Sequence, residues 1–258
     1  MNTTLITGAS SGIGAAFARK LAARGRNVLL VARSEDKLIT LCNELGRLTS
    51  IRAQYLTLDL QQPDAGSILF EETNKRGLEI EMLINNAGFG SMGDFGKLDL
   101  DRELEIIELN IRALVDLTHR FLGPMRERKR GTIINVASTA GFQAVPYMGT
   151  YAATKAFVIS FSEALWEENR SHGVHVMALC PGVTDTNFFA AAGMERPPMR
   201  MIQTPEEVVD TALRALGHRK HLVISGWTNW FAVGAERFFP RSLVTRFVGR
   251  ALRSRFEE

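Results

Sequence analysis

The sequence predicts an α/β fold, in which one parallel sheet of about seven strands is covered by helices on both faces. Short apolar runs without alternation are typical of strands buried on both sides, as in a parallel sheet. Helical patterns separate these runs along the chain, which favours repeated strand-helix-strand units. Hydrophobic residues make up 45% of the 258 positions, and no repeat or linker tract divides them, so we expect a single domain.

Seven apolar runs are the strand candidates, and most are rich in Val, Ile, Leu and Thr. They are Thr4–Thr7, Val28–Val31, Tyr55–Leu58, Met82–Ile84, Thr132–Val136, Val174–Leu179 and His221–Ile224. Helical patterns lie between them at Ala15–Ala23, Ser34–Leu45, Asp99–Glu127, Thr150–Glu168 and Pro205–Leu216. Such sheets bind ligands beyond the carboxyl ends of their strands, so residues that directly follow a strand are the first candidates for a site.

A glycine-rich turn, Gly8-Ala9-Ser10-Ser11-Gly12-Ile13-Gly14, follows the first strand and leads into an Ala-rich helix. Glycines let the backbone approach a pyrophosphate closely, and the N–H groups at a helix start point at the anion. The spacing is G-x-x-x-G-x-G rather than G-x-G-x-x-G, but strand, turn and helix occur in the order that a dinucleotide-binding loop requires. We predict dinucleotide binding here, with a purely conformational turn as the alternative.

Arg33-Ser34, which follows the second strand, indicates the type of dinucleotide. An NAD site usually places Asp or Glu near this position, whereas an arginine accommodates the 2′-phosphate of NADP. A guanidinium binds phosphate through charge-assisted hydrogen bonds. The sequence therefore favours NADP(H), with a solvated arginine at the start of a helix as the alternative.

Tyr151 and Lys155 are the candidate pair for proton transfer. Residues four apart share one face of a helix, so the phenol and the ammonium project the same way. A neighbouring cation favours a phenolate, and we therefore expect Lys155 to lower the pKa of Tyr151. A tyrosine at the edge of the core beside a solvated lysine is the alternative, because this spacing occurs in many unrelated helices.

Together these segments resemble the short-chain dehydrogenase/reductase family over nearly the whole chain. Thr7–Gly14 is similar to the family's T-G-x-x-x-G-x-G loop, and Asn85-Asn86-Ala87-Gly88 to its N-N-A-G segment. Pro181–Thr186 resembles the segment that grips the nicotinamide, and Asp59-Leu60 the position that contacts adenine.

The resemblance implies a Rossmann-type, doubly wound sheet and a catalytic tetrad of Asn110, Ser138, Tyr151 and Lys155. It also implies cofactor contacts, and these are expected from Gly8, Ser10, Ser11, Gly12, Ile13, Gly14, Arg33, Ser34, Asp59, Leu60, Asn86, Ala87, Gly88, Tyr151, Lys155, Pro181, Gly182, Val183, Thr184 and Thr186.

The activity implied by the resemblance is that of an NADP(H)-dependent oxidoreductase that interconverts a carbonyl and an alcohol. Tyr151 would act as general acid or base, Ser138 would hold the carbonyl oxygen, and Lys155 would hold the nicotinamide ribose. Asn110 would position a water that connects Lys155 to solvent. An NAD-dependent alcohol dehydrogenase and a non-catalytic NADP-sensing regulatory protein are the alternatives. We expect no metal, because no His/Cys/Asp cluster has ligand spacing.

The substrate is expected to be an apolar ketone, aldehyde or 3-oxoacyl compound. Residues Asn187–Gln203 are apolar and Met-rich, which suggests a lid over such a molecule. Phe89, Val145 and Met148 are the candidates for lining its pocket. A surface loop that packs its own phenylalanines is the alternative to a lid.

Residues 1–226 are expected to form the catalytic domain, and 227–258 a basic amphipathic extension of it. Apolar residues of the extension recur at roughly helical spacing, with arginines between them. We expect this extension to pack against its own domain or a neighbouring subunit. Association with an anionic membrane surface is the less favoured alternative.

Composition limits the partners and the location. The formal net charge is only +3, which does not suggest a nucleic-acid partner. The first strand begins too close to Met1 for a signal peptide, and no apolar run reaches the length of a membrane span, so we expect a cytoplasmic protein. The family resemblance implies a homodimer or homotetramer that pairs the helices Arg102–Phe121 and Thr150–Glu168.

Overall fold

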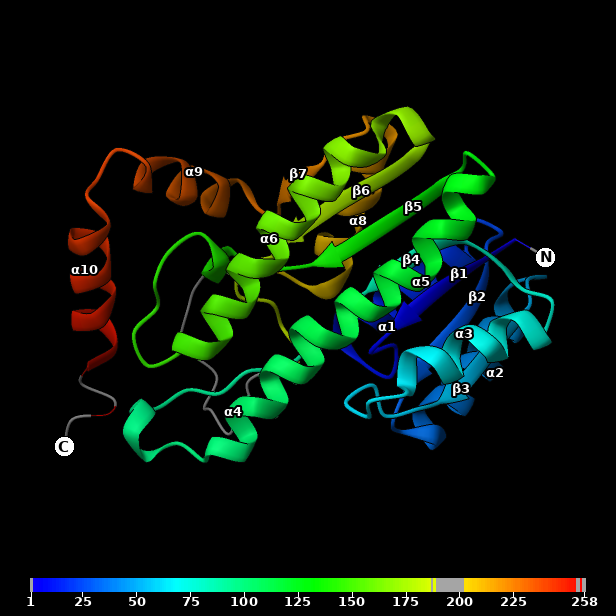
Figure 1. Cartoon of the computed structure of the whole chain (residues 1–258), viewed down its shortest axis with the longest axis horizontal. Coiled ribbons are helices and arrows are strands. Elements are labelled where there is room, and N and C mark those ends of the chain that lie inside the picture. Colours follow the sequence, from blue (N-terminus) through cyan, green and yellow to red (C-terminus); the bar gives the residue numbers. More distant parts are fainter. Residues whose placement is uncertain (1, 187, 189–201, 254–255, 257–258) are drawn as a thin grey trace.

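The chain folds around one seven-stranded parallel sheet that lies between layers of helices (Figure 1). The architecture is that of a computed structural model, which describes residues 2–186, 188, 202–253 and 256. The strand order is β3-β2-β1-β4-β5-β6-β7, so the chain starts mid-sheet, winds to one edge and returns across β1 to build the other half. This reversal places a topological switch point beside β1, where α/β sheets bind ligands. The predicted doubly wound fold is confirmed.

A strand forms at each of the seven predicted apolar runs, with small shifts at the ends. The bounds are β1 (Asn2–Thr7), β2 (Asn27–Ala32), β3 (Ala53–Thr57), β4 (Glu79–Asn85), β5 (Gly131–Val136), β6 (Val174–Cys180) and β7 (Leu222–Ile224). Every residue of β6 is buried, as are five consecutive residues of β1. Burial on both faces explains why these runs are continuous rather than alternating.

Helices cover both faces of the sheet. Successive residues of β1 point into opposite layers, so that Ile6 packs in one hydrophobic core and Leu5 in another. The helices packed in the core of Ile6 are α1 (Gly12–Ala22), α2 (Glu35–Leu48) and α8 (Pro205–Gly217). The opposite face is covered by α3 (Ala65–Lys75), α5 (Leu114–Glu127) and α6 (Gly149–Asn169). Short 3-10 turns are η1 (Phe95–Lys97), η3 (Thr139–Gly141) and η4 (Arg170–His172).

The single long helix expected over Asp99–Glu127 is wrong in detail. The chain instead forms α4 (Leu100–Ile107), a π-helical segment η2 (Glu108–Ala113) and then α5. The Asp99 carboxylate caps α4 by accepting from the Asp101 amide at 3.1 Å. A π segment widens the helix without interrupting it, so apolar periodicity does not reveal it. Its consequence is local, because Asn110 lies within it.

The C-terminal residues form two helices, α9 (Trp227–Glu236) and α10 (Arg241–Arg253). Figure 1 shows α10 standing apart from the sheet, on the side to which the carboxyl end of β5 points. One contact returns from the end of the chain to the loop before α6, where the rings of Phe256 and Tyr147 stack at 4.8 Å. Among the helices in the described part of the chain, none is both long and apolar enough to span a bilayer. The expected lid lies outside the described residues except at Phe188, Ile202 and Gln203.

Candidate active site

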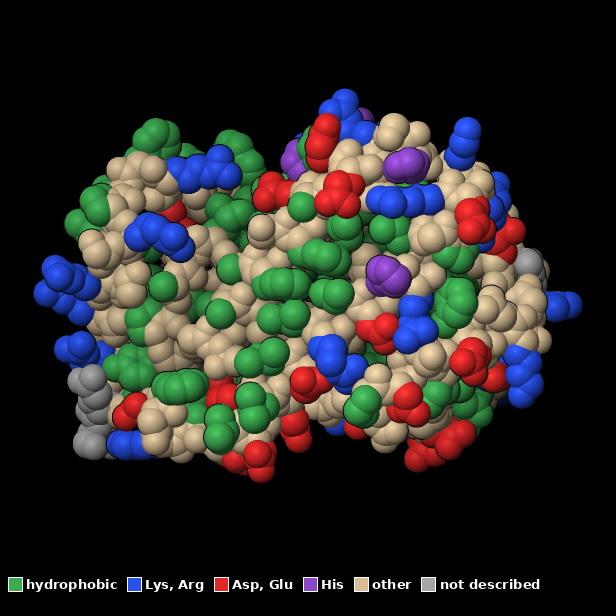
Figure 2. Space-filling view, in the orientation of Figure 1, with side chains coloured by type: hydrophobic (Ala, Val, Ile, Leu, Met, Phe, Trp, Pro, Cys, Tyr) green, Lys and Arg blue, Asp and Glu red, His purple; other side chains and the backbone are tan. Residues whose placement is uncertain are grey.

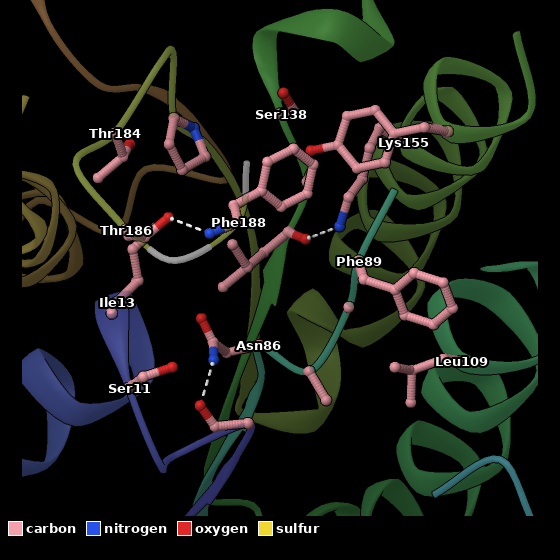
Figure 3. A pocket seen from close by; sticks show the side chains of 18 of the residues that line it. Ser11, Ile13, Asn86, Phe89, Leu109, Ser138, Lys155, Thr184, Thr186 and Phe188 are labelled. Atoms are coloured by element: carbon pink, nitrogen blue, oxygen red, sulfur yellow. Dashed lines mark hydrogen bonds between the residues drawn. The ribbon is translucent and has the colours of Figure 1, made fainter. Parts of the chain in front are cut away.

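Thr7 and Asn86 join the carboxyl ends of β1 and β4. The Thr7 hydroxyl oxygen accepts hydrogen bonds from the backbone amides of Asn86 at 2.9 Å and Ala87 at 3.0 Å. In return, the Asn86 Nδ2 donates to the carbonyl oxygens of Thr7 at 2.9 Å and Gly8 at 3.2 Å. These bonds fix the glycine turn to the N-N-A-G segment at the switch point of the sheet (Figure 3).

Gly14 allows the start of α1 to pack directly on this junction. A Cβ atom at Gly14 would lie 2.4 Å from the Gly8 carbonyl oxygen and 2.6 Å from the Asn86 Nδ2. Both distances are far below contact distance, so only glycine fits here. Gly14 does not line the cavity described next, and its predicted contact with the cofactor stays a prediction.

The strand ends surround a cavity of about 440 Å³ that holds nearly all the predicted site residues (Figure 3). The predicted residues that line it are Gly8, Ser10, Ser11, Gly12, Ile13, Arg33, Ser34, Asp59, Leu60, Asn86, Ala87, Gly88, Ser138, Tyr151, Lys155, Pro181, Gly182, Val183, Thr184 and Thr186. Of the predicted substrate-pocket residues, Phe89 and Met148 line the cavity and Val145 does not. Leu109 lines it as well and was not predicted, and Phe188, a residue of the expected lid, also lines it.

Tyr151 is a buried residue of the cavity wall, with only 8% of its surface exposed. Burial raises the pKa of its phenol to about 12, and a hydrogen bond with the Ser138 side chain opposes this shift. Ser138 is itself held at the start of η3, because its Oγ accepts from the Ala140 amide at 3.1 Å. The ring of Phe188 packs on the Tyr151 ring with centroids 5.2 Å apart.

Lys155 lies one helical turn beyond Tyr151, and its Nζ donates to the Val136 carbonyl oxygen at 2.9 Å. Burial lowers the pKa of this amine to about 8. Its Nζ is 5.7 Å from the centroid of the Tyr151 ring. The expected lowering of the Tyr151 pKa by Lys155 does not occur in the protein alone, because burial is the larger effect on the phenol.

Asn110 lies beside this pair but behind the cavity wall. Its Nδ2 donates to the Thr154 hydroxyl at 3.0 Å, and the Thr154 hydroxyl donates to the Tyr151 carbonyl oxygen at 2.7 Å. The backbone of Gly88 passes between Asn110 and Lys155: a Cβ there would lie 2.8 Å from the Asn110 Oδ1 and 3.5 Å from the Lys155 Nζ. The π-helical segment therefore brings Asn110 against α6, the helix of Tyr151, and Asn110 does not line the cavity.

Arg33 lies at the other end of the cavity, at the carboxyl end of β2. Its guanidinium is exposed and reaches the Gln61 Oε1 at 3.4 Å, which is a weak contact that a stronger acceptor can replace. Ser34 occupies the N-cap position of α2. The arginine thus stands beside a helix start, and both features suit a phosphate group.

Comparison with known proteins decides the family. The sequence matches the family described as short chain dehydrogenase over residues 2–196, most of the chain. The protein belongs to the short-chain dehydrogenase/reductase family. It is therefore an oxidoreductase of that family, as the sequence predicted.

Several members of the short-chain dehydrogenase/reductase family are similar over most of their length. A 7beta-hydroxysteroid dehydrogenase of Collinsella aerofaciens is 32% identical over 229 residues, covering 87% of this chain and 86% of the relative. The very-long-chain 3-oxoacyl-CoA reductase of Homo sapiens is 33% identical over 219 residues, covering 83% of this chain and 68% of the relative. A solved short-chain dehydrogenase from Sphingobium yanoikuyae in complex with NADPH is 32% identical, with a TM-score of 0.84, and covers 92% of this chain and 93% of that one.

The sequence did not predict three polar contacts that lie beside the cavity of this protein. They are made by the hydroxyls of Thr7 and Thr154 and by the Asn110 side chain toward Phe89. Thr7 belongs to the T-G-x-x-x-G-x-G segment, so the motif itself contains the signal. No pattern in the sequence indicates Thr154, which is one of several small residues on α6 and is recognised only from its position against the π-helical segment.

Proposed function

We propose that the protein is an NADP(H)-dependent oxidoreductase that interconverts an apolar ketone, aldehyde or 3-oxoacyl compound and its alcohol, with residues 1–226 as the catalytic domain. The observation that carries this proposal is the set of residues that line one cavity. Ser138, Tyr151 and Lys155 line one part of it, and Arg33 lines another. The order of strands puts the glycine turn between them, at the switch point.

The residues present fit a dinucleotide phosphate. The backbone turn Ser10–Ile13 lines the cavity at the start of α1, where its amides would hold the pyrophosphate. Arg33 and Ser34 would hold the 2′-phosphate, Asp59 and Leu60 the adenine, and Pro181–Thr186 the nicotinamide end. When bound, NADPH supplies the hydride that reduces the carbonyl carbon.

Two hydroxyls of the chain would bind the carbonyl oxygen of the substrate. The hydrogen bond between Ser138 and Tyr151 brings both hydroxyls to one point, and the η3 turn holds Ser138 in place. Tyr151 would donate its proton to the oxygen as negative charge develops there, and Ser138 would stabilise that charge. A phenol whose pKa is raised to about 12 is protonated at neutral pH, which is the state that a general acid needs.

Lys155 would resupply the proton and hold the nicotinamide ribose. Its pKa of about 8 allows the amine to gain and lose a proton near neutral pH. Asn110 would act by positioning, because it holds the Phe89 backbone and Thr154 rather than facing the cavity.

The cavity wall near Tyr151 supports an apolar substrate. Phe89, Leu109, Met148 and Phe188 contribute apolar surface there. The names of two relatives, a 7beta-hydroxysteroid dehydrogenase and a very-long-chain 3-oxoacyl-CoA reductase, support a substrate with a bulky apolar body beside the reacting carbonyl. We therefore propose bulky apolar ketones or 3-oxoacyl thioesters in preference to small polar carbonyls.

The proposal is tested by measuring cofactor binding and turnover separately. Dissociation constants for NADPH and NADH are measured by fluorescence for the wild type, Arg33→Ala and the control Arg47→Ala, which changes an exposed arginine of α2. We expect tighter NADPH binding, and a loss on the order of 10- to 100-fold for NADPH alone in Arg33→Ala. Tighter binding of NADH by the wild type would contradict the proposed cofactor.

Turnover is then measured with a panel of bulky ketones, small aldehydes and a 3-oxoacyl thioester. The proposed function expects oxidation of NADPH with at least one bulky apolar carbonyl. NADPH binding without turnover of any substrate in the panel would favour a non-catalytic sensor.

We also propose a homodimer or homotetramer through α4 and α6. Leu104 and Ile107 of α4 and Phe157 of α6 are large apolar residues that remain exposed. Light scattering of the wild type and of Phe157→Ser tests this. A monomeric wild type would rule the assembly out. A lower molar mass for Phe157→Ser than for the wild type would place the subunit interface at α6.

A further inference from the structure

The α9–α10 segment, residues 227–253, exposes an unusual amount of aromatic surface, and we call it the aromatic-basic arm. Seven large apolar residues are exposed within it: Trp227 81%, Trp230 64%, Phe231 68%, Phe238 87%, Phe239 55%, Leu243 53% and Phe247 72%. Soluble monomers rarely leave a contiguous apolar patch of this kind in water, and such patches mark a binding surface.

Helix α10 has one broad apolar face with unequal exposure. Val244, Val248 and Leu252 are half-buried and lie along one part of this face. Leu243 and Phe247, one turn apart on the adjoining part, are exposed. The side of the helix that carries Leu243 and Phe247 therefore remains exposed to solvent.

Positive charge accompanies this exposed side. The stretch Arg237–Arg253, all of which the structure describes, contains exposed arginines at five positions and no carboxylate: Arg237, Arg241, Arg246, Arg250 and Arg253. Figure 2 shows Lys and Arg side chains along the edge where α10 lies and hydrophobic side chains over α9. A partner for this surface must accept aromatic rings and negative charge together.

We propose that the aromatic-basic arm docks the protein on an anionic lipid surface. Trp and Phe side chains enter the boundary between headgroups and acyl chains, and arginines bind the lipid phosphates. A second copy packed through the same surface would bring the arginines of one arm against those of the other, which is unfavourable. Charge complementarity thus favours lipid as the occupant.

The docking would bring the cavity close to the lipid. Helix α10 stands on the side to which β5 points its carboxyl end (Figure 1). The residues that line the cavity lie at the carboxyl ends of the strands. Phe256, just beyond the arm, stacks on Tyr147, four residues before Tyr151. None of the residues of the aromatic-basic arm lines the cavity, so lipid docking does not depend on the proposed function.

The test is co-sedimentation of the full chain with vesicles of phosphatidylcholine, alone or with an equal share of phosphatidylglycerol. We expect binding only to the mixed vesicles, and weaker binding at high salt. The variant Arg241→Gln/Arg246→Gln/Arg250→Gln should lower the partition coefficient on the order of 100-fold, since each arginine contributes roughly 5-fold. Trp230→Ser/Phe247→Ser should lower it at least about 10-fold at unchanged charge.

The matched control is Arg24→Gln/Arg47→Gln/Arg52→Gln, which removes three exposed arginines near α1, α2 and β3, remote from α10 (Figure 1). It should bind vesicles like the wild type, and every variant should keep its NADPH dissociation constant as a check of folding. Absence of wild-type binding to anionic vesicles, or an equal loss in the control, would overturn the proposal. A change in molar mass by light scattering in the arm variants, with vesicle binding unchanged, would overturn it in favour of a second copy.

Discussion

The side-chain amide of Asn110 forms two hydrogen bonds with the backbone of Phe89. Its Nδ2 donates to the Phe89 carbonyl oxygen at 3.0 Å, and its Oδ1 accepts from the Phe89 amide at 3.2 Å. Because Nδ2 also donates to Thr154, this one side chain ties the loop after β4 to the helix that carries Tyr151 and Lys155. The relationship gives Asn110 a positioning role that can be measured.

Asn110→Ala should lower both stability and turnover. The change leaves the Phe89 backbone and the Thr154 hydroxyl without their buried partner, which costs about 1–3 kcal/mol. We expect kcat to fall on the order of 10- to 100-fold with little change in the NADPH dissociation constant. Urea denaturation and steady-state kinetics measure the two effects, with Asn43→Ala on the exposed side of α2 as control. Wild-type kcat in Asn110→Ala would remove the positioning role.

Tyr151→Phe should abolish turnover and keep cofactor binding. The substitution removes the phenolic proton while the ring still packs on Phe188. Since general acid catalysis contributes on the order of 10²- to 10⁴-fold, kcat/KM should fall at least that far. A fluorescence titration with NADPH serves as the control for folding. Activity like that of the wild type would overturn the proposed mechanism.

The free energy of unfolding should rise with pH between about pH 8 and pH 9 in the protein without cofactor. The pKa of Lys155 is about 8 when folded and 10.5 in its ordinary state, so within this window the unfolded chain binds a proton that the folded chain has lost. Above pH 9 the thiols of Cys42 and Cys180 oppose the rise, because burial raises their pKa values from 9.0 to about 11 and about 12 and the unfolded chain loses their protons first. The Lys155 contribution alone is roughly 3 kcal/mol at most. Above pH 10 the unfolded chain loses the Tyr151 proton while the folded chain keeps it up to about pH 12, so the phenol contributes a decrease.

Urea denaturation at several pH values between 7 and 10 checks this prediction. Lys155→Met should remove the rise, whereas Lys37→Met, which changes an exposed lysine of α2, should keep it. An unchanged pH dependence in Lys155→Met would show that another group is responsible.

Two glycine substitutions should have opposite effects. In Gly14→Ala the new methyl group would meet the Gly8 carbonyl oxygen and the Asn86 side chain, so stability should fall by about 1–3 kcal/mol and NADPH binding should weaken. In Gly46→Ala the methyl group meets no atom within 4 Å inside helix α2, so stability should rise by about 0.5–1 kcal/mol. Thermal melts with and without NADPH separate the two effects, and equal melting temperatures would contradict the close packing at Gly14.

A chain of buried side chains crosses the core beneath the site, and its members should be energetically coupled. Asn85 Nδ2 donates to the Asn135 Oδ1 at 2.9 Å, and Asn135 Nδ2 donates to the Ser162 Oγ at 2.9 Å. Asn135→Ala should cost about 1–3 kcal/mol, because it removes two buried hydrogen bonds, whereas the Thr118 hydroxyl stays bonded to Asn85 and the Val158 carbonyl oxygen to Ser162. In a double-mutant cycle with Ser162→Ala, the two losses should add to more than the loss in the double variant. Strict additivity would show that the contacts are independent.

Much of the fold could be predicted because its signal is local. The strands at the centre of the sheet are apolar on both faces. A run such as Val174–Leu179 can therefore be recognised as a strand from its own residues, without knowing which strands lie beside it. The glycine turn, Arg33, Ser138 and Tyr151 could be placed together for a related reason: each lies in a segment that follows a strand or matches a family motif.

The parts that could not be predicted depend on contacts between distant segments. The sequence did not indicate that the lack of a side chain at Gly14 is needed for the packing of α1 on Asn86. Lys155 was expected to lower the Tyr151 pKa, yet the extent of burial decides the direction, and burial is a property of the folded chain. The arginines of α10 repeat at helical spacing in the sequence, which does not reveal that they accompany exposed aromatic rings.

The π-helical segment Glu108–Ala113 makes this part of the chain sensitive to length rather than to composition. A π turn holds about one residue more than the α turn that it replaces. Deleting one residue within the segment would let an ordinary α turn take its place, so α4 and α5 would keep their directions while Asn110 would face a direction about 100° away from its present one. Asn110 would then leave Phe89 even though no side chain had been exchanged. In this segment, therefore, an insertion or deletion is expected to be more harmful than most substitutions.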